Sequence, residues 1–207
     1  FYSKRLNEYT DDNKTLNSAY GARIFGTHKD FPNQWENVKN KFLADSDTRQ
    51  GVININYSDD QNRVTKDVTC TLALQYLIRD NKFHAITMMR SNDAFMGLIY
   101  DLFCFTMLQE LFMLELKQHE KFSNLELGNY IHNVNSFHLY EDYFSKVEDV
   151  VRETYTGVVM SPMITNEINE LQKDEMLLRT ENKLINSYKY NPPWDWCAEQ
   201  LNKKVQK

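Results

Sequence analysis

DVTCTLALQYLIRDNKFHAITMMRSNDAFMGLIYD, residues 67–101, contains two apolar runs separated by Asp80-Asn81, a pair typical of a tight turn. From Cys70 to Ile78 every second residue is apolar, which predicts a strand with one buried face. Residues 82–91 then resume an apolar run of strand length. This stretch therefore predicts a hairpin of two long strands.

The hairpin is expected to bring Cys70 close to Arg90. The two residues have the same parity and stand at the far ends of the two strands, so they can point to one side of the sheet. A guanidinium in this position lowers the pKa of a thiol and binds an anion. Two other interpretations stay open, in which Cys70 is a small core residue and Arg90 is a surface ion-pair partner.

The rest of the chain completes an α+β pattern. Helical spacing of Trp35, Val38 and Phe42 predicts a helix over residues 32–44. We further expect strands over 51–57 and 129–140, helices over 141–156 and 166–187, and a surface turn or tail at NPPWDW, residues 191–196.

The longest apolar stretch, residues 94–116, is expected to be a buried core helix rather than a membrane span. Several charged or polar side chains, Asp101 among them, would lie at membrane depth at a cost of about 2.5–3.5 kcal/mol for each charge. A buried carboxylate such as Asp101 is also costly in a protein core unless it has a partner, a raised pKa or a ligand.

Composition predicts a single domain, residues 1–207, in which 42% of the residues are hydrophobic and the net charge is -5. This charge gives no basic field, so we expect no nucleic-acid binding. Three scattered cysteines argue against a disulfide framework or a metal site and favour a cytoplasmic protein. The chain begins without methionine, and no secretory signal is recognisable.

Several motifs in one order make the chain resemble the thymidylate synthase superfamily over about residues 5–145. They are DDNKTLNSAYG at 11–21, DSDTRQGVININ at 45–56, the quoted stretch at 67–101, and NSFHLY at 135–140. The resemblance implies an α+β thymidylate synthase fold, with a mixed sheet packed against helices and a homodimer formed through the sheet. It also implies that the family's N-terminal segment is missing.

The same resemblance implies the chemistry of the site. Cys70 would be the nucleophile that adds to C6 of a pyrimidine nucleoside monophosphate, and Tyr20 would organise the water that takes the C5 proton. Asp93 would orient 5,10-methylenetetrahydrofolate and act in catalysis, and Gly97 would let the backbone approach the base. As alternatives, Tyr20 would be a core aromatic and Asp93 a helix N-cap.

The nucleotide-binding residues follow from the resemblance in the same way. Arg90 and Ser91 would hold the 5′-phosphate, and Arg49 would reach the phosphate in the partner subunit's site. His138 and Tyr140 would bind the sugar hydroxyl, although His138 is also explained as a satisfied strand histidine. The chain departs from the family pattern at Gln50, where a second arginine is usual, and at Thr71, after the nucleophile.

Asp101 occupies a position that is asparagine in thymidylate synthases. Cytosine presents an acceptor at N3 and a donor at its 4-amino group, the reverse of uracil. A protonated Asp101 would complement cytosine, and a carboxylate would complement cytosine protonated at N3. The resemblance therefore favours a C5 hydroxymethyltransferase acting on dCMP or CMP. The alternatives are a divergent thymidylate synthase acting on dUMP, an inactive scaffold of the same fold, or Asp101 as a local backbone cap.

Overall fold

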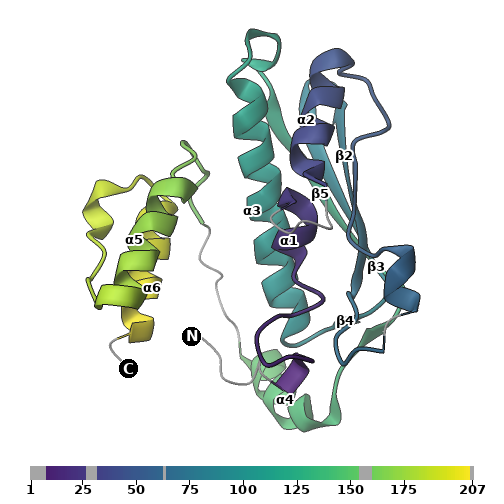
Figure 1. The fold of residues 1–207 in the computed structure, drawn as a ribbon, viewed down its shortest axis with the longest axis vertical. Coiled ribbons are helices and arrows are strands. Elements are labelled where there is room, and N and C mark those ends of the chain that lie inside the picture. Colours follow the sequence, from purple (N-terminus) through teal and green to yellow (C-terminus); the bar gives the residue numbers. More distant parts are fainter. Residues whose placement is uncertain (1–7, 27–31, 63, 154–159, 206–207) are drawn as a thin grey trace. The chain divides into compact units, whose positions relative to one another are not determined.

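The computed structural model describes residues 8–26, 32–62, 64–153 and 160–205, and the chain divides into two compact units (Figure 1). One unit spans residues 5–154 and the other is built mainly from residues 155–207. Each unit is described by itself below. The expectation of a single domain stays a prediction.

The larger unit is organised around a four-stranded sheet with the order β1-β2-β3-β5. The neighbours β1/β2 and β2/β3 are antiparallel, whereas β3/β5 is parallel, so the predicted mixed sheet is confirmed. A separate parallel pair joins β4 to β6. The strands are β1 (Val52–Asn54), β2 (Thr71–Arg79), β3 (Lys82–Met89), β4 (Asn92–Asp93), β5 (Glu126–Val134) and β6 (Phe137–His138).

The predicted hairpin is confirmed as β2 and β3. Asp80 and Asn81 at its turn have φ values of 50° and 58°, a left-handed conformation that Asp and Asn tolerate better than most residues. The expected alternation is wrong at the start of β2, because the pairing register shifts between Thr71 and Ala73. One extra residue in a strand reverses the side-chain direction beyond it. Thr71 is therefore buried where Leu72 was expected.

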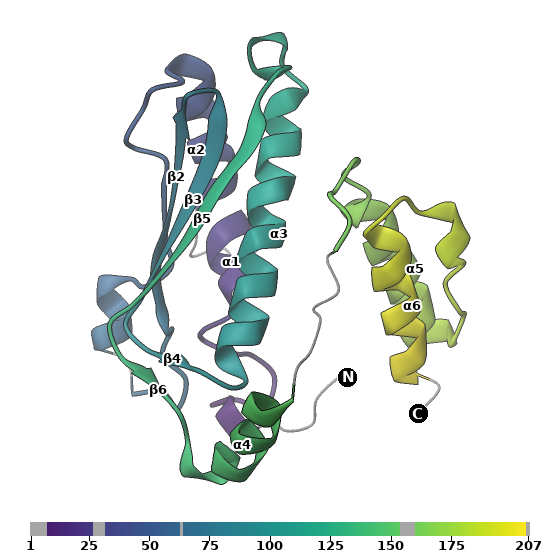
Figure 2. The ribbon, with the colours of Figure 1, turned by 180° about the vertical axis from the view of Figure 1, so that it is seen from behind.

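Three helices cover one face of this sheet, as Figures 1 and 2 show: α1 (Tyr20–Phe25), α2 (Gln34–Ala44) and α3 (Gly97–Lys117). The helix predicted over residues 32–44 is confirmed, with Asn33 as its N-cap. The core between helices and sheet is largely aromatic. The ring of Phe112 lies 4.4 Å from Trp35, 5.1 Å from Tyr76 and 5.3 Å from Phe83, measured between centroids.

Helix α3 is a core helix over most of its length. Its buried side chains run from Phe105 to Leu116, and the buried Gln109 amide donates to the carbonyl oxygen of Phe83 at 2.8 Å. The expected burial is wrong at the N-terminal end, where Ile99 and Tyr100 are each 63% exposed. By length and composition alone, α3 is long and apolar enough to cross a membrane. Core helices of soluble proteins often meet the same criterion.

Two expectations near residue 140 need correction. The single strand expected over 129–140 is two strands, β5 and β6, because the ladder breaks at Asn135-Ser136. The helix expected over 141–156 begins as the 3₁₀ helix η4 (Glu141–Tyr143) and continues as α4 (Phe144–Arg152). Residues 154–156 lie outside the described residues. Two further 3₁₀ helices are η2 (Ser58–Gln61) and η3 (Glu120–Phe122).

The smaller unit is helical. It contains α5 (Ile168–Glu181), η5 (Ser187–Lys189) and α6 (Trp194–Val205). The helix predicted over residues 166–187 is confirmed only up to Glu181, because Asn182 takes a left-handed conformation that ends α5. The surface turn expected at NPPWDW is wrong in part, because Trp194 begins α6 and is only 3% exposed. Its indole nitrogen donates to the carbonyl oxygen of Thr165 at 2.6 Å, which satisfies the polar end of a buried ring.

Candidate active site

The hairpin places Cys70 and Arg90 directly opposite each other. The backbone N–H of Arg90 donates to the carbonyl oxygen of Cys70 at 2.9 Å, and Nη2 of Arg90 lies 3.8 Å from the Cys70 sulfur. The guanidinium also donates to the carbonyl oxygens of Thr69 and Val68, at 3.0 and 3.1 Å. These backbone contacts hold the cation beside the thiol, so the predicted proximity is confirmed, but strand parity is not its cause. The register from Arg79–Lys82 to Ala73–Met88, continued without a bulge, would set Cys70 opposite Ser91, and the shift between Thr71 and Ala73 sets it opposite Arg90.

The protonation of Cys70 differs from the expectation. Burial raises the pKa of this half-buried thiol, and it outweighs the lowering by Arg90. The negative charges of Asp101 and Asp67 raise the pKa further. The lowering of the pKa by Arg90 is confirmed, but burial outweighs it, so Cys70 is mainly a thiol at neutral pH.

Ser91, His138 and Tyr140 come together through the short β4-β6 pair. In this pair the backbone N–H of Asn92 donates to Ser136 at 3.0 Å. Oγ of Ser91 lies 3.5 Å from Nδ1 of His138, and the rings of His138 and Tyr140 meet edge to face at 4.9 Å. Tyr140 is 57% exposed. The three side chains are therefore linked by successive contacts, and Ser91 directly follows Arg90 in the chain.

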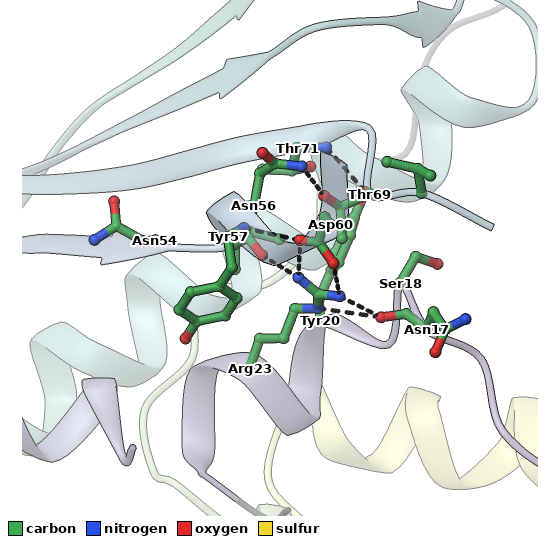
Figure 3. A network of polar contacts seen from close by, with 12 residues as sticks. Asn17, Ser18, Tyr20, Arg23, Asn54, Asn56, Tyr57, Asp60, Thr69 and Thr71 are labelled. Carbon is green, nitrogen blue, oxygen red and sulfur yellow. Dashed lines mark hydrogen bonds and ion pairs between the residues drawn. The ribbon is translucent and has the colours of Figure 1, made fainter. Parts of the chain in front are cut away.

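Tyr20 reaches the residue that follows the candidate nucleophile. Its hydroxyl oxygen accepts from the backbone N–H of Thr71 at 3.3 Å (Figure 3). Its ring stacks on Phe105 with centroids 6.0 Å apart. Burial raises the pKa of this phenol. The position suits a residue that orients water near Cys70, while the stack on Phe105 also supports the alternative of a core aromatic.

A buried ion pair, which the sequence did not reveal, anchors the helix that carries Tyr20. Arg23 on α1 is 1% exposed and donates to both carboxylate oxygens of Asp60 on η2, at 2.5 and 2.8 Å (Figure 3). It also donates to the carbonyl oxygens of Ile55 and Asn17, at 2.7 and 2.6 Å. Arginine in a short apolar helix carries no motif, so no sequence signal pointed to this contact.

Asp93 is engaged by the turn that precedes α3. Its carboxylate accepts from the backbone N–H groups of Phe95, Met96 and Gly97 at 3.2, 2.8 and 3.1 Å. Burial acts to raise the pKa of Asp93, but these donors prevail and lower it. Asp93 thus caps the turn before α3, whereas the N-cap of α3 itself is Met96, so the alternative of Asp93 as the helix N-cap is wrong in position. A role toward folate stays a prediction.

Asp93 also lines a pocket of about 380 Å³. Aromatic rings supply much of its wall, which suits a flat heterocycle. A Cβ added to Gly97 would meet Asp93 and Asn92 only at ordinary contact distances of 3.5 and 3.6 Å, so this glycine is not required by the protein's own packing. The lining residues of the pocket are Tyr9, Asp93, Met96, Tyr140, Asp142 and Tyr143.

Asp101 has a protein partner, Asn92, whose side-chain Nδ2 donates to Oδ2 of the carboxylate. Burial raises the pKa of Asp101 to about 6, although the Asn92 hydrogen bond acts in the opposite direction. The charge of Asp101 in turn raises the pKa of Cys70 and of Tyr20. Asp101 is therefore near enough to Cys70 and Tyr20 for its charge to affect the pKa of both groups.

Two polar groups near Asp101 were not anticipated. Tyr130 on β5 donates to Oγ1 of Thr87 at 3.0 Å and lies 2.7 Å from Nδ1 of His132, and burial together with Asp101 raises its pKa to about 12. Asn92 was read only as part of a motif, yet it is 3% exposed and contacts Asp101. Strand alternation predicts that Tyr130 and His132 share a face, but it gives no hint of Asp101 beside them.

Arg49 lies away from Cys70 within this chain. It is exposed and lines a polar pocket of about 600 Å³ together with Arg79, at the far end of β2. The carbonyl oxygen of Arg49 accepts from Nε2 of Gln75 at 3.3 Å, and Gln75 stands five residues along the chain from Cys70, roughly 17 Å at about 3.3 Å per residue. The structure therefore does not bring Arg49 to the Cys70 of its own chain, and its role in a partner subunit's site stays a prediction. Among the residues that the structure describes, no cluster of three His, Cys, Asp or Glu side chains is suited to a metal ion.

Similar proteins include phage hydroxymethyltransferases. The chain is 31% identical over 166 residues to the deoxyuridylate hydroxymethyltransferase of Bacillus phage SP01, covering 74% of this chain and 42% of that protein. It is 29% identical over 137 residues to the deoxycytidylate 5-hydroxymethyltransferase of Enterobacteria phage T4, covering 64% and 55%. A thymidylate synthase of Fusobacterium nucleatum is 25% identical over 153 residues, covering 73% and 53%.

This chain thus spans about half the length of these curated relatives. A family model described as thymidylate synthase matches residues 3–195, nearly the whole chain. The match agrees with the mixed sheet, with the opposition of Cys70 and Arg90, and with the adjacency of Ser91 and His138. The chain belongs to the thymidylate synthase family.

Proposed function

We propose that this chain belongs to an enzyme that hydroxymethylates C5 of a cytidine nucleoside monophosphate, dCMP or CMP, with 5,10-methylenetetrahydrofolate as the one-carbon donor. The observation that carries the choice of base is Asp101, a carboxylate whose pKa is raised to about 6 and which lies close enough to Cys70 to affect the pKa of that thiol. Cytosine offers Asp101 an amine donor, whereas uracil presents a carbonyl oxygen at the same place.

Each residue of the site has a separate role in binding the nucleotide or in catalysis. Arg90 and Ser91 hold the 5′-phosphate next to Cys70, and His138 with Tyr140 contacts the sugar. The sulfur of Cys70 forms a bond to C6, which makes C5 nucleophilic, and breaking that bond later restores the aromatic ring. Since Cys70 is mainly protonated in the free protein, its proton must leave as the bond forms. Tyr20, beside Thr71, orients the water that removes the C5 proton.

The pocket beside Asp93 fits the folate donor. Its aromatic walls suit a pterin ring, and the carboxylate of Asp93 matches the donor edge of such a ring. When bound, methylenetetrahydrofolate would supply the one-carbon group, one water would supply the hydroxyl, and tetrahydrofolate would leave, so no reductant is needed. This chain's residues would position the ring and the nucleotide. Asp93 and Gly97 are the residues expected to contact it.

A homodimer through the uncovered face of the sheet completes the proposal. Along one register row of that face lie Val52, Gln75, Ile86 and Ile131, contributed by the four strands in turn. Ile131 is 45% exposed, and the helices α1 to α3 occupy only the opposite face. An apolar row of this kind favours self-association. It would also allow Arg49 to reach the site of the second subunit.

A second candidate is hydroxymethylation of a uridine nucleotide. It is favoured by the 31% identity to a deoxyuridylate hydroxymethyltransferase, and the two candidates differ only in the base. A divergent thymidylate synthase is a weaker alternative, because the thymidylate synthase relative is 25% identical.

The test is incubation of the protein with dCMP, CMP, dUMP or UMP and methylenetetrahydrofolate, with products identified by mass. We expect a gain of one hydroxymethyl group on a cytidine nucleotide. Asp101→Asn should lower the ratio of kcat/KM for the cytidine over the uridine nucleotide by at least about tenfold, equal to about 1.4 kcal/mol. Asp149→Asn, at an exposed position on α4, is the matched control. Preference of the native protein for dUMP would establish the second candidate instead.

A further inference from the structure

Asn92 is a buried amide with one unexplained polar atom. It is 3% exposed, its Nδ2 donates to Oδ2 of Asp101, and the same nitrogen lies 3.4 Å from the sulfur of Met89. Its Oδ1 is buried without a hydrogen-bond partner among the described residues. Buried unpaired acceptors are rare in native proteins, so this orientation of the amide calls for a reason. The contact with Asp101 is the one that orients it.

The hydrogen bond from Asn92 has a large influence on the charge of Asp101, because the other described groups around this carboxyl do not stabilise its ionised form. The titratable groups that face it are Tyr20 on α1, Cys70 before β2, Cys104 on α3 and Tyr130 on β5, and none of them is a cation at neutral pH. Burial favours the neutral acid, and only the Asn92 hydrogen bond acts against it. Within the described part of the chain, Asn92 is thus the one group found to support the carboxylate.

We propose that Asn92 is a positioning residue that sets the base preference of the site by holding Oδ2 of Asp101 and favouring its ionised form. Oδ1 then remains as the oxygen available to accept from the exocyclic amine of cytosine. Of the two pairing modes open to Asp101, this favours the carboxylate, which pairs with cytosine protonated at N3, over the carboxylic acid, which would donate to N3 of neutral cytosine. The link to cytosine rests on the proposed function; the effect of Asn92 on Asp101 does not.

The first measurement needs no turnover. In protein labelled with ¹³C at the aspartate carboxyl carbons, the Asp101 signal is identified by its loss in Asp101→Asn and titrated by NMR. The native midpoint is expected near pH 6. Asn92→Leu keeps a similar volume without the donor, and its midpoint should rise by about one pH unit, a tenfold change in proton affinity. Asn40→Leu, at an exposed position on α2, should leave the midpoint unchanged.

The second measurement is the ratio of dissociation constants for dCMP and dUMP, by calorimetry at about pH 6.5, midway between the two midpoints, where the difference in charge is largest. Asn92→Leu should lower the preference for dCMP by about threefold, which is the expected change in the ionised fraction of Asp101. If the Leu variant does not fold, Asn92→Ala is used in both measurements. An unchanged midpoint overturns the proposal, and a shifted midpoint with an unchanged ratio overturns its link to specificity. Failure of the native protein to transfer a hydroxymethyl group would refute the proposed function without affecting the midpoint test.

Discussion

Burial and hydrogen bonding act in opposite directions on the pKa of Asp101. It lies on the first turns of α3 among apolar side chains, and its one partner among the described residues is a neutral amide. A neutral donor compensates a buried charge less completely than a cation does, so the carboxyl keeps a pKa near 6. The residue therefore changes charge close to neutral pH, as groups at functional sites often do.

The raised pKa of Asp101 predicts a dependence of stability on pH. The folded pKa of about 6 exceeds the value of about 3.9 expected in an unfolded chain. Between these two values the folded protein binds more protons than the unfolded chain does, so the contribution of Asp101 to stability is present at low pH and is lost as pH rises to about 6.

Asp101→Asn removes this dependence, because an amide does not titrate. The free energy of unfolding is measured with urea for both proteins. We expect the difference, variant minus native, to be larger at about pH 7.5 than at about pH 4.5. Asp149→Asn should show no such difference, since that carboxylate is exposed. An equal effect of Asp101→Asn at both pH values would contradict the raised pKa.

Cys70 offers the most direct test of the chemistry. Cys70→Ser removes the sulfur that is expected to bond to C6, so exchange of the C5 proton of the nucleotide with solvent should fall by at least about a thousandfold. Circular dichroism should be unchanged, because the backbone contact to Arg90 does not involve the side chain. Cys104→Ser and Cys197→Ser should retain exchange. Normal exchange in a folded Cys70→Ser protein would exclude it as the nucleophile.

Between elements, the ion pair of Arg23 and Asp60 ties α1 to η2. Both side chains are almost fully buried, at 1% and 6% exposure. A single replacement leaves one charge without its partner, so Arg23→Met should lower the free energy of unfolding by about 3–5 kcal/mol. The exposed pair Arg152–Glu148 provides the control, and Arg152→Met should change stability by about 0.5 kcal/mol or less.

A double variant separates the contribution of the Arg23–Asp60 ion pair to stability from that of side-chain packing. Arg23→Met combined with Asp60→Leu should cost less than the sum of the two single changes, because neither charge is then left alone. Additive costs in chemical denaturation would show that the two residues act independently. The same single variants should lower activity if the position of Tyr20 over Thr71 depends on α1.

At the scale of the whole molecule, the position of Arg49 predicts shared sites in the proposed dimer. Arg49→Ala and Cys70→Ser should each be inactive or nearly so. When the two are mixed and allowed to exchange subunits, half of the dimers are hybrids with one complete site, which restores about a quarter of native activity. Continued inactivity after exchange has been verified by mass would show that Arg49 does not act across the interface.

Much of the site was predictable because strand geometry is local. The turn at Asp80-Asn81 and the apolar runs on both sides of it fix the pairing of β2 with β3, which brings the strand ends that carry Cys70 and Arg90 together. The bulge at Leu72, which sets Cys70 opposite Arg90 rather than Ser91, was not predictable, because an unpaired residue depends on the partner strand as much as on its own sequence. The same applies to the break at Asn135-Ser136, where a strand that continues in the sequence leaves one sheet and joins another.

The hairpin, the core helix and the family motifs can be recognised from the amino-acid sequence, because they depend on periodicity and on residues within a few positions of one another. The environment of individual side chains depends instead on how the elements pack together. The sequence could place Asp101 on a helix, but its pKa depends on Asn92, Tyr20 and Tyr130, which three other elements supply. Burial and charge act through space, so the protonation of Asp101 and of Cys70 is a property of the assembled fold.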